Sequence, residues 1–432
     1  MKIGVVGIWH LGEVVACSLA ELGHEIIGID ENQAVINNLQ NGLVPLAEPG
    51  LTELLNKHRA SGHLNFSTDF SSIHDCESVF LTFDTPVGED DEPDLSLLFQ
   101  SVEKTALHIH PQTLFVVMSQ VPVGTTKKLF SAIKKVNPMF TGNVVYFPEN
   151  LQLGQALKCF LQPDRFVVGT DDGGARKKFE LIIEKIVCPR QFTNIASAEM
   201  TKHALNAFLA TSLSFIYNIS DLCEQVGADV TAVSEALRSD QRIGPGAYLD
   251  SSLGFSGGTL MRDLKTLNHL SAEYGRPIPV ISGVLETNEM RRKQLVQRLE
   301  KIFQIPLSQL RLGILGVTYK PGTPTLRRSL CLEIVDILLN KKAQVSIYDP
   351  GASPDELFKK TGIKMSSDPY EMADDCHGIL LITAWPEFQS LDFARLKSTM
   401  SNPRIFFDTR NFFKSDEEKI NEDGLKYVGM GR

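Results

Sequence analysis

Short apolar runs alternate with helical patterns through the first third of the chain. The runs at residues 2–6, 25–29, 78–82, 114–119 and 143–147 predict strands, and residues 165–169 are a further candidate. Segments long enough for crossover helices separate them. Buried strands that alternate with helices predict a parallel sheet covered by helices on both faces.

The pattern becomes purely helical from about residue 197 to 237, with apolar residues recurring at three- and four-residue spacing. Glycines and prolines cluster at 244–258 and indicate a loop, and helical character resumes at 262–303. A second α/β region begins at Arg311. Its strands are expected at 311–316, 344–348, 378–382 and 404–407.

The fold class expected from this order is α/β, with two doubly wound parallel-sheet domains joined by a central helical domain. The predicted boundaries are 1–196, 197–303 and 304–432. A chain of 432 residues is too long for one core, which agrees with several domains. A long apolar helix in the central domain would suit a dimer interface.

Composition narrows the class of protein. The formal charge of −9 argues against general nucleic-acid binding. The first apolar stretch is soon interrupted by Glu13 and Glu21, and no later stretch reaches about 18 apolar residues, so neither a signal peptide nor a membrane span is expected. The seven cysteines are never spaced as CxxC and are interpreted as reduced, mostly buried thiols of a cytoplasmic protein.

A dinucleotide-binding turn is expected directly after the first strand. Residues 7–12 read Gly-Ile-Trp-His-Leu-Gly and open a helix, and Asp30 closes the second strand. In such a Rossmann-like turn the helix N–H groups face a pyrophosphate and the acid binds a ribose hydroxyl, which favours NAD over NADP. Trp9 occupies the position of the middle glycine of the motif. Its side chain either swings aside or stacks on a ligand, or it narrows the nucleotide site. The alternative is a domain that no longer binds a nucleotide, and we favour nucleotide binding.

Many short segments, in order along the chain, match one set of motifs. They are Pro45 with EPGL at 48–51, Thr85-Pro86 with PDL at 93–95, SQVPVGT at 119–125, PENLQLG at 148–154, PDR at 163–165, Glu199 with Lys202 and Asn206, RIG at 242–244, GFSGGTLMRD at 254–263, YKP at 319–321, Arg327 with Ser329, Thr383 with Trp385, DTRN at 408–411 and GMGR at 429–432. The chain thereby resembles the UDP-glucose/GDP-mannose dehydrogenase family over residues 2–432.

The resemblance implies a NAD-binding domain, a helical dimerisation domain and a domain that binds a nucleotide sugar such as UDP-glucose. It implies a homodimer that uses NAD. The cofactor-binding residues expected on this basis are Gly7, Trp9, His10, Leu11, Gly12, Asp30, Thr85, Pro86, Gln120 and Arg327.

Polar residues of the central domain carry the expected chemistry. Lys202 and Asn206 are four residues apart and project from one helical face. By resemblance they line the sugar pocket with Asp263: the lysine stabilises a developing alkoxide, and the amide and carboxylate position the hydroxyl or a water. Without the family, a surface charge and a helix cap would be preferred. The β-hydroxyacid dehydrogenases share the Lys-x-x-x-Asn spacing, so it does not fix the substrate.

The segment 254–263 departs from the family at its centre. The family signature is GFGGSCFPKD, whose cysteine holds the oxidised sugar as a thioester, and here Thr259 takes the place of that cysteine. Leu153 replaces the second glutamate of PEFLREG, which leaves Glu149, and Gln120 replaces the threonine of STVPPGT. A threonine hydroxyl is essentially never ionised near neutral pH, so the covalent step is expected to be lost.

The sugar-nucleotide end keeps polar anchors. Arg262 replaces the lysine of FPKD and can still pair with an anion, and Tyr248 is a candidate stacking surface for a base. Pro324 and Thr325 replace acids of the family. The expected substrate-binding residues are Leu151, Arg242, Tyr248, Gly254, Phe255, Gly257, Arg262, Lys320 and Arg410.

The function predicted from the sequence is one two-electron oxidation of a nucleotide sugar, most simply a UDP-sugar, by an NAD-dependent enzyme. A variant of this reaction returns the hydride to the other face and is an epimerisation. The alternatives are a catalytically silent protein that binds a nucleotide sugar, and a four-electron dehydrogenase without a covalent intermediate.

Overall fold

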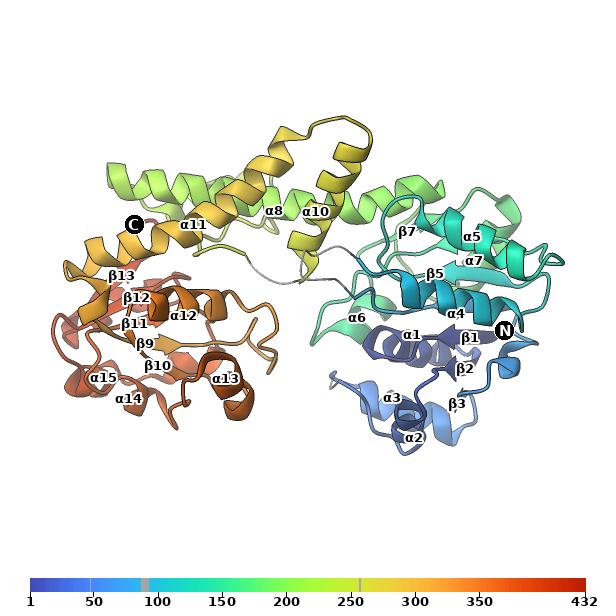
Figure 1. Ribbon diagram of the computed structural model, residues 1–432, viewed down its shortest axis with the longest axis horizontal. Coiled ribbons are helices and arrows are strands. Elements are labelled where there is room, and N and C mark those ends of the chain that lie inside the picture. Colours follow the sequence, from blue (N-terminus) through green and yellow to red (C-terminus); the bar gives the residue numbers. More distant parts are fainter. Residues whose placement is uncertain (47, 87–92, 256–257) are drawn as a thin grey trace. The chain divides into compact units, whose positions relative to one another are not determined.

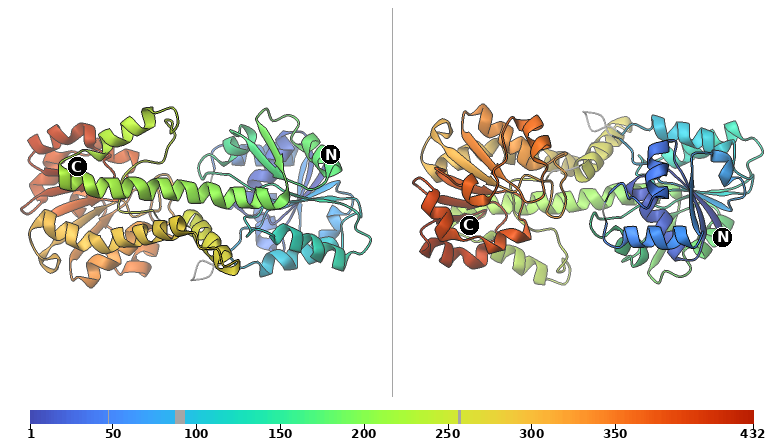
Figure 2. Two further views of the ribbon diagram at one scale, coloured as in Figure 1. Left: turned by 90° about the horizontal axis from the view of Figure 1, so that it is seen from above. Right: turned by 90° about the horizontal axis from the view of Figure 1, so that it is seen from below.

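A computed structural model describes residues 1–46, 48–86, 93–255 and 258–432. The chain forms two compact units, Met1–Ala204 and Leu205–Arg432. The division falls inside α8 (Ile195–Val226), a single long helix that is clear in both views of Figure 2. The division into three domains remains a prediction.

The first unit is built on an eight-stranded sheet with the order β3-β2-β1-β4-β5-β6-β7-β8 (Figure 1). Its strands are β1 (Lys2–Val6), β2 (Glu25–Ile29), β3 (Leu64–Ser67), β4 (Ser78–Leu81), β5 (Leu114–Val117), β6 (Val144–Tyr146), β7 (Phe166–Gly169) and β8 (Arg190–Thr193). All neighbouring strands are parallel except β6 and β7, which pair antiparallel.

Helices cover both faces of this sheet. They are α1 (His10–Glu21), α2 (Gln33–Gln40), α3 (Leu51–Ala60), α4 (Ser96–Ala106), α5 (Thr125–Val136), α6 (Ala156–Leu161) and α7 (Gly173–Ile182), with a short 3-10 helix, Phe70–Ile73. Alternate strand residues belong to two separate apolar clusters: Phe80 and Val116 pack with α1, α3, α6 and α7, whereas Val79 and Val117 pack with α4 and α5. This is the period-two pattern of a sheet that is buried on both sides.

The second unit combines a helical part with a five-stranded parallel sheet of order β10-β9-β11-β12-β13. Its strands are β9 (Arg311–Leu315), β10 (Gln344–Tyr348), β11 (Gly378–Leu381), β12 (Ile405–Asp408) and β13 (Lys426–Gly429). Its helices after α8 are α9 (Val230–Ser239), α10 (Gly258–Glu273), α11 (Pro279–Phe303), α12 (Leu330–Asn340), α13 (Pro354–Thr361), α14 (Pro369–Met372), α15 (Phe393–Thr399) and α16 (Glu417–Glu422). Three 3-10 helices lie at Leu307–Gln309, Pro386–Ser390 and Lys414–Asp416.

The predicted fold class is confirmed, and each predicted strand is present with its ends shifted by at most two residues. Three strands were not predicted: β3, β8 and β13. Each is the outermost strand of its sheet, so only part of its surface is covered. Their half-exposed residues lack the continuous apolar run on which the prediction depended.

The cysteines are unpaired, and Cys17, Cys76, Cys223, Cys331 and Cys376 are buried, as predicted. Within the described residues, no helix has the length and apolar character needed to cross a membrane.

Candidate active site

The turn between β1 and α1 has the shape of a dinucleotide-binding turn. Gly7 has a φ of +94°, which favours glycine. A Cβ atom on Gly12 would lie 2.1 Å from the Gly7 carbonyl oxygen, so only glycine allows the helix to start this close to the strand. The Asp30 Oδ2 atom accepts a hydrogen bond of 3.0 Å from the Ile8 N–H group, which fixes the acid at the end of β2. This arrangement fits NAD.

Trp9 does not distort this turn. Its φ of −102° and ψ of −164° are extended backbone that any residue adopts, and its side chain is 48% exposed. The next residue, His10, contacts the Glu48 Oε1 atom at 3.0 Å, and the same oxygen accepts a hydrogen bond of 2.8 Å from the Gly154 N–H group. Glu48 therefore connects the turn to the loop that follows β6.

The second unit contains a similar turn after β9, but the acid of this turn is covered by other side chains. The Val317 N–H group donates to Asp349 as Ile8 donates to Asp30, at 2.7 Å. Asp349 is only 2% exposed, and the Trp385 indole N–H donates to it at 3.1 Å. Because the second acid is covered, it offers no carboxylate to a ribose, and the turn of the first unit is the one that suits a dinucleotide.

Helix α1, which follows the first turn, carries a buried acidic residue, Glu13. Glu13 is fully buried, and neither of its carboxylate oxygens has a hydrogen-bond partner among the described residues. Burial raises the pKa of Glu13 to about 8. A buried carboxyl group is disfavoured in its charged form, so Glu13 is held largely protonated near neutral pH.

This pKa predicts that stability falls as pH rises. The folded chain keeps the Glu13 proton up to about pH 8, whereas the unfolded chain releases it near its ordinary pKa of 4.5. The contribution of the Glu13 proton to stability is complete below pH 4.5 and is lost progressively up to pH 8, for a total on the order of 5 kcal/mol. Urea unfolding of Glu13→Gln and wild type at several pH values measures it. The difference between the two should change with pH, and the same comparison with the exposed control Glu53→Gln should not.

Two further loops of the first unit carry predicted cofactor residues. Thr85 follows β4 and is buried, and its hydroxyl donates to the Gln120 carbonyl oxygen, which follows β5, at 2.8 Å. Pro86 is the exposed residue next to it. The structure therefore brings these loops together at the carboxyl ends of neighbouring strands. Arg327 belongs to the second unit and lies exposed before α12.

Lys202 and Glu149, two of the predicted catalytic residues, contact each other in the first unit. The Lys202 ammonium donates to the Glu149 carbonyl oxygen at 2.5 Å and lies 3.2 Å from the Glu149 Oε1 atom. The Lys202 side chain is 6% exposed, so this charge is not the solvated surface charge that the lysine alone would suggest. Glu149 also accepts a hydrogen bond from the Leu151 N–H group at 2.8 Å, which orders the start of its loop.

Asn206 and Asp263 form the corresponding pair of the second unit. Asn206 follows Lys202 by four residues on α8, and its amide donates to the Asp263 carboxylate. Asp263 is fully buried on α10, one helical turn after Thr259, which is exposed at the start of that helix. Four of the five predicted catalytic residues thus form two hydrogen-bonded pairs, and one member of each pair, Lys202 or Asn206, lies on neighbouring turns of α8. Thr259 belongs to neither pair.

The second unit contains a cavity of about 800 Å³. The predicted residues that line it are Tyr248, Gly254, Phe255, Lys320 and Arg410. Leu260, the residue after Thr259, also lines it. The cations Lys320 and Arg410, the Tyr248 ring and apolar side chains of this lining suit a ligand that carries phosphates and a planar base.

Other predicted residues lie elsewhere. Arg242 is paired with Asp240 at 2.7 Å, and its side chain is 88% exposed. Arg262 is half-buried on α10, outside the cavity lining, and Leu151 belongs to the first unit. Gly257 lies outside the described residues.

The cavity also has lining residues that the sequence analysis missed. They include Tyr217, Arg238, Thr318, Tyr319, Cys331 and Thr383. The pKa of Tyr319 is raised, first by burial and then by neighbouring Tyr248, so a pair of tyrosines marks one side of the cavity. Only Tyr319 and Thr383 fell within a recognised motif. Tyr217, Arg238 and Cys331 come from three helices, and Thr318 from the loop after β9, and none of these segments carries a local signal.

Cys331 is the one cysteine among the lining residues. It is fully buried, and burial raises the pKa of its thiol. The thiolate is the nucleophilic form of cysteine, so this thiol is not activated for covalent catalysis.

Two α/β units, one with an open dinucleotide turn and one with a polar cavity, define a dinucleotide-dependent oxidoreductase. Residues 1–187 match the NAD binding domain of the UDP-glucose/GDP-mannose dehydrogenase family, residues 196–290 its central domain and residues 313–415 its UDP binding domain. The chain belongs to this family, which confirms the expected class, an NAD-dependent nucleotide-sugar dehydrogenase.

The chain is similar to known UDP-glucose dehydrogenases over its whole length. It is 33% identical to the UDP-glucose 6-dehydrogenase of Rhizobium meliloti strain 1021, with full coverage of both chains. It is 32% identical to the UDP-glucose 6-dehydrogenase TuaD of Bacillus subtilis, covering 100% of this chain and 93% of TuaD. Among solved structures, a UDP-glucose dehydrogenase from Pyrobaculum islandicum superposes with a TM-score of 0.89 at 28% identity, covering 100% of this chain and 97% of that one.

Proposed function

We propose that this enzyme oxidises one alcohol carbon of a UDP-linked sugar once and releases the carbonyl product. The observation that carries the proposal is Thr259 at the position where the family signature has cysteine. The cavity of the second unit, with Lys320 and Arg410 in its wall, is the proposed site of the UDP portion.

The hydroxyl group must lose a proton while its carbon loses a hydride. Bound NAD supplies the hydride acceptor. The Lys202 ammonium stabilises negative charge that develops on the sugar oxygen, and its fixed contact with Glu149 keeps it in one orientation. Asp263, held by the Asn206 amide, positions the hydroxyl or a water next to it, and that water takes up the hydroxyl proton and passes it to solvent.

We infer that the second step lacks its nucleophile in this enzyme. A thioester requires a thiolate, and a threonine hydroxyl does not ionise near neutral pH. The cavity thiol of Cys331 has a raised pKa. Leu153 also replaces one of the carboxylates that the family associates with hydrolysis. The reaction should therefore end at the aldehyde or ketone.

The test counts reduced cofactor against sugar. Purified enzyme with NAD and a limiting amount of each UDP- or GDP-sugar is followed by absorbance of reduced cofactor, and products are trapped with hydroxylamine for mass spectrometry. We expect one reduced cofactor per sugar and an oxime of the carbonyl product. Two reduced cofactors per sugar with a uronic acid would show a four-electron enzyme. Binding of UDP without any turnover would show a silent binding protein.

We also propose that two copies of the chain associate through α8. Phe208, Phe215, Leu222 and Val226 are each at least half exposed and lie seven, seven and four residues apart, so they form one apolar stripe. A continuous exposed stripe on a long helix is typical of an interface.

Phe215→Glu should separate the copies, because a carboxylate within the stripe would be buried without a partner. Light scattering should give twice 47.9 kDa for wild type and 47.9 kDa for the variant. Val187→Glu, which changes an exposed valine outside α8, is the control and should keep the wild-type mass. A monomeric wild-type protein would contradict the proposal.

A further inference from the structure

The loop before α10 is held from behind by α11. Gly254 and Phe255 line the cavity. The Asn288 side chain, which is fully buried, pairs with the Phe255 main chain in both directions, accepting from its N–H at 2.8 Å and donating to its carbonyl at 3.0 Å. Gly254 has a φ of +137°, and a Cβ atom there would lie 2.9 Å from the Asn288 Oδ1 atom. The loop is therefore fitted closely to this asparagine.

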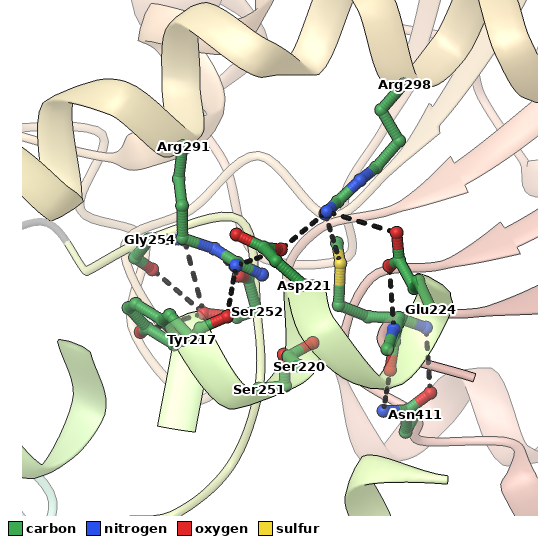
Figure 3. A network of polar contacts seen from close by, with 12 residues as sticks. Tyr217, Ser220, Asp221, Glu224, Ser251, Ser252, Gly254, Arg291, Arg298 and Asn411 are labelled. Carbon is green, nitrogen blue, oxygen red and sulfur yellow. Dashed lines mark hydrogen bonds and ion pairs between the residues drawn. The ribbon is translucent and has the colours of Figure 1, made fainter. Parts of the chain in front are cut away.

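Arg291 lies three residues later on the same helix and holds the same loop. Its Nε atom donates to the Ser252 carbonyl at 2.8 Å, and its Nη1 atom donates to the Tyr217 carbonyl at 2.8 Å and to Asp221 at 2.6 Å (Figure 3). The guanidinium carbon also lies 4.8 Å from the centroid of the Tyr217 ring. One buried side chain thus joins the loop to α8.

The contacts continue to the part of the cavity lining that contains Arg410. Asp221 also accepts from Arg298 at 2.6 Å, and Arg298 contacts the Met430 sulfur at 2.6 Å (Figure 3). Asn411 pairs with the Met430 main chain in both directions, at 2.9 and 3.0 Å. The residue before Asn411 is Arg410, which lines the cavity. Polar contacts therefore run from the wall at Phe255 to the wall at Arg410.

We propose that these five residues, Asn288, Arg291, Asp221, Arg298 and Asn411, form a positioning clamp that fixes the two walls of the nucleotide cavity at one spacing. None of the five lines the cavity, so they act through the walls and not on the ligand. The inference rests on the proposed UDP site.

A role in stability alone explains the clamp poorly. Buried ion pairs are often no more stabilising than apolar side chains of the same volume. Here Arg291 is 4% exposed, its Nη2 atom has no hydrogen-bond partner among the described residues, and it shares one carboxylate with Arg298. The directional hydrogen bonds of one guanidinium and two carboxamides instead fix the distance between main-chain segments that are far apart in the sequence.

Arg291→Lys is the test, with UDP alone as the probe. Lysine keeps the charge and can reach Asp221, but it cannot serve three acceptors with fork geometry. We expect the dissociation constant for UDP, measured by calorimetry, to rise about tenfold, with NAD binding and a cooperative melting transition retained. The matched control is Arg292→Lys, which changes the adjacent arginine, paired with Glu333 outside the clamp. It should leave UDP binding unchanged.

The outcomes separate the two proposals. If wild-type protein does not bind UDP, the cavity assignment itself is wrong. If it binds UDP, and folded Arg291→Lys binds it within about twofold of wild type, the clamp is wrong. Should the variant not fold, hydrogen exchange of the wild-type protein decides: UDP should slow exchange of both the Phe255 and the Met430 amides, and slowing at neither or at only one of them overturns the clamp.

Discussion

Lys202→Met should lower the rate of sugar oxidation by about 10³-fold, the largest loss expected from a single substitution in this enzyme. Methionine fills a similar volume but carries no charge to stabilise the developing alkoxide. In the first unit, the Lys202 ammonium donates to the Glu149 carbonyl oxygen at 2.5 Å. NAD binding should remain within about twofold of wild type, because the dinucleotide turn is unchanged. Initial rates and cofactor titration measure the two effects separately.

Two comparisons make this result specific. Lys158→Met removes an exposed lysine of α6 and should retain the wild-type rate. Lys202→Arg keeps a cation beside Glu149 and should recover part of the rate. If Lys202→Met loses less than about tenfold while it remains folded, the lysine is a structural partner of Glu149 and stabilises no charge in the transition state.

The strands inside each sheet were predictable because burial on both faces leaves a continuous apolar run. β1 and β2 have the predicted ends, and so does β10, although it is an outer strand of its sheet. The outer strands β3, β8 and β13 were not predictable in this way, because a partner on one edge alone permits polar residues. The antiparallel β6–β7 pair was also missed, since an apolar run contains no information about direction.

The same distinction applies to the site. The turn at Gly7 and Gly12 is local in sequence, so its geometry follows from residues within one strand and one helix. The cavity combines Arg238, Cys331 and Thr383 from three distant elements. Tertiary packing brings these three residues together, and their spacing in the sequence does not predict that they are close in space.

The burial of individual groups was equally inaccessible to the sequence. Without the family resemblance, Lys202 would have been interpreted as a surface charge, and it is 6% exposed. In the sequence, Glu13 was noted only as a charged residue that interrupts an apolar stretch. In the structure it lies next to the dinucleotide turn, and burial raises its pKa to about 8. Both results depend on which neighbours exclude water, a property of the folded chain.

Thr259→Cys should convert the enzyme from one oxidation to two. When the first product is an aldehyde, a cysteine at this position can add to it, and transfer of the remaining hydride of the adduct to a second NAD yields a thioester on the protein. Leu153 replaces one carboxylate associated with hydrolysis, so the thioester should accumulate. Intact-protein mass spectrometry after addition of NAD and sugar should show an acyl adduct, and reduced cofactor should appear in a second burst equal to the number of active sites.

The matched variants show what limits each step. Thr259→Ser keeps a hydroxyl and should form no adduct, because serine without an adjacent base is as weak a nucleophile as threonine. Adding Leu153→Glu to Thr259→Cys should shorten the lifetime of the adduct and release an acid, since a carboxylate would again be available to activate water. A Thr259→Cys enzyme that still yields one reduced cofactor per sugar and no adduct would mean that access or geometry at α10, and not the missing sulfur, ends the reaction after one oxidation.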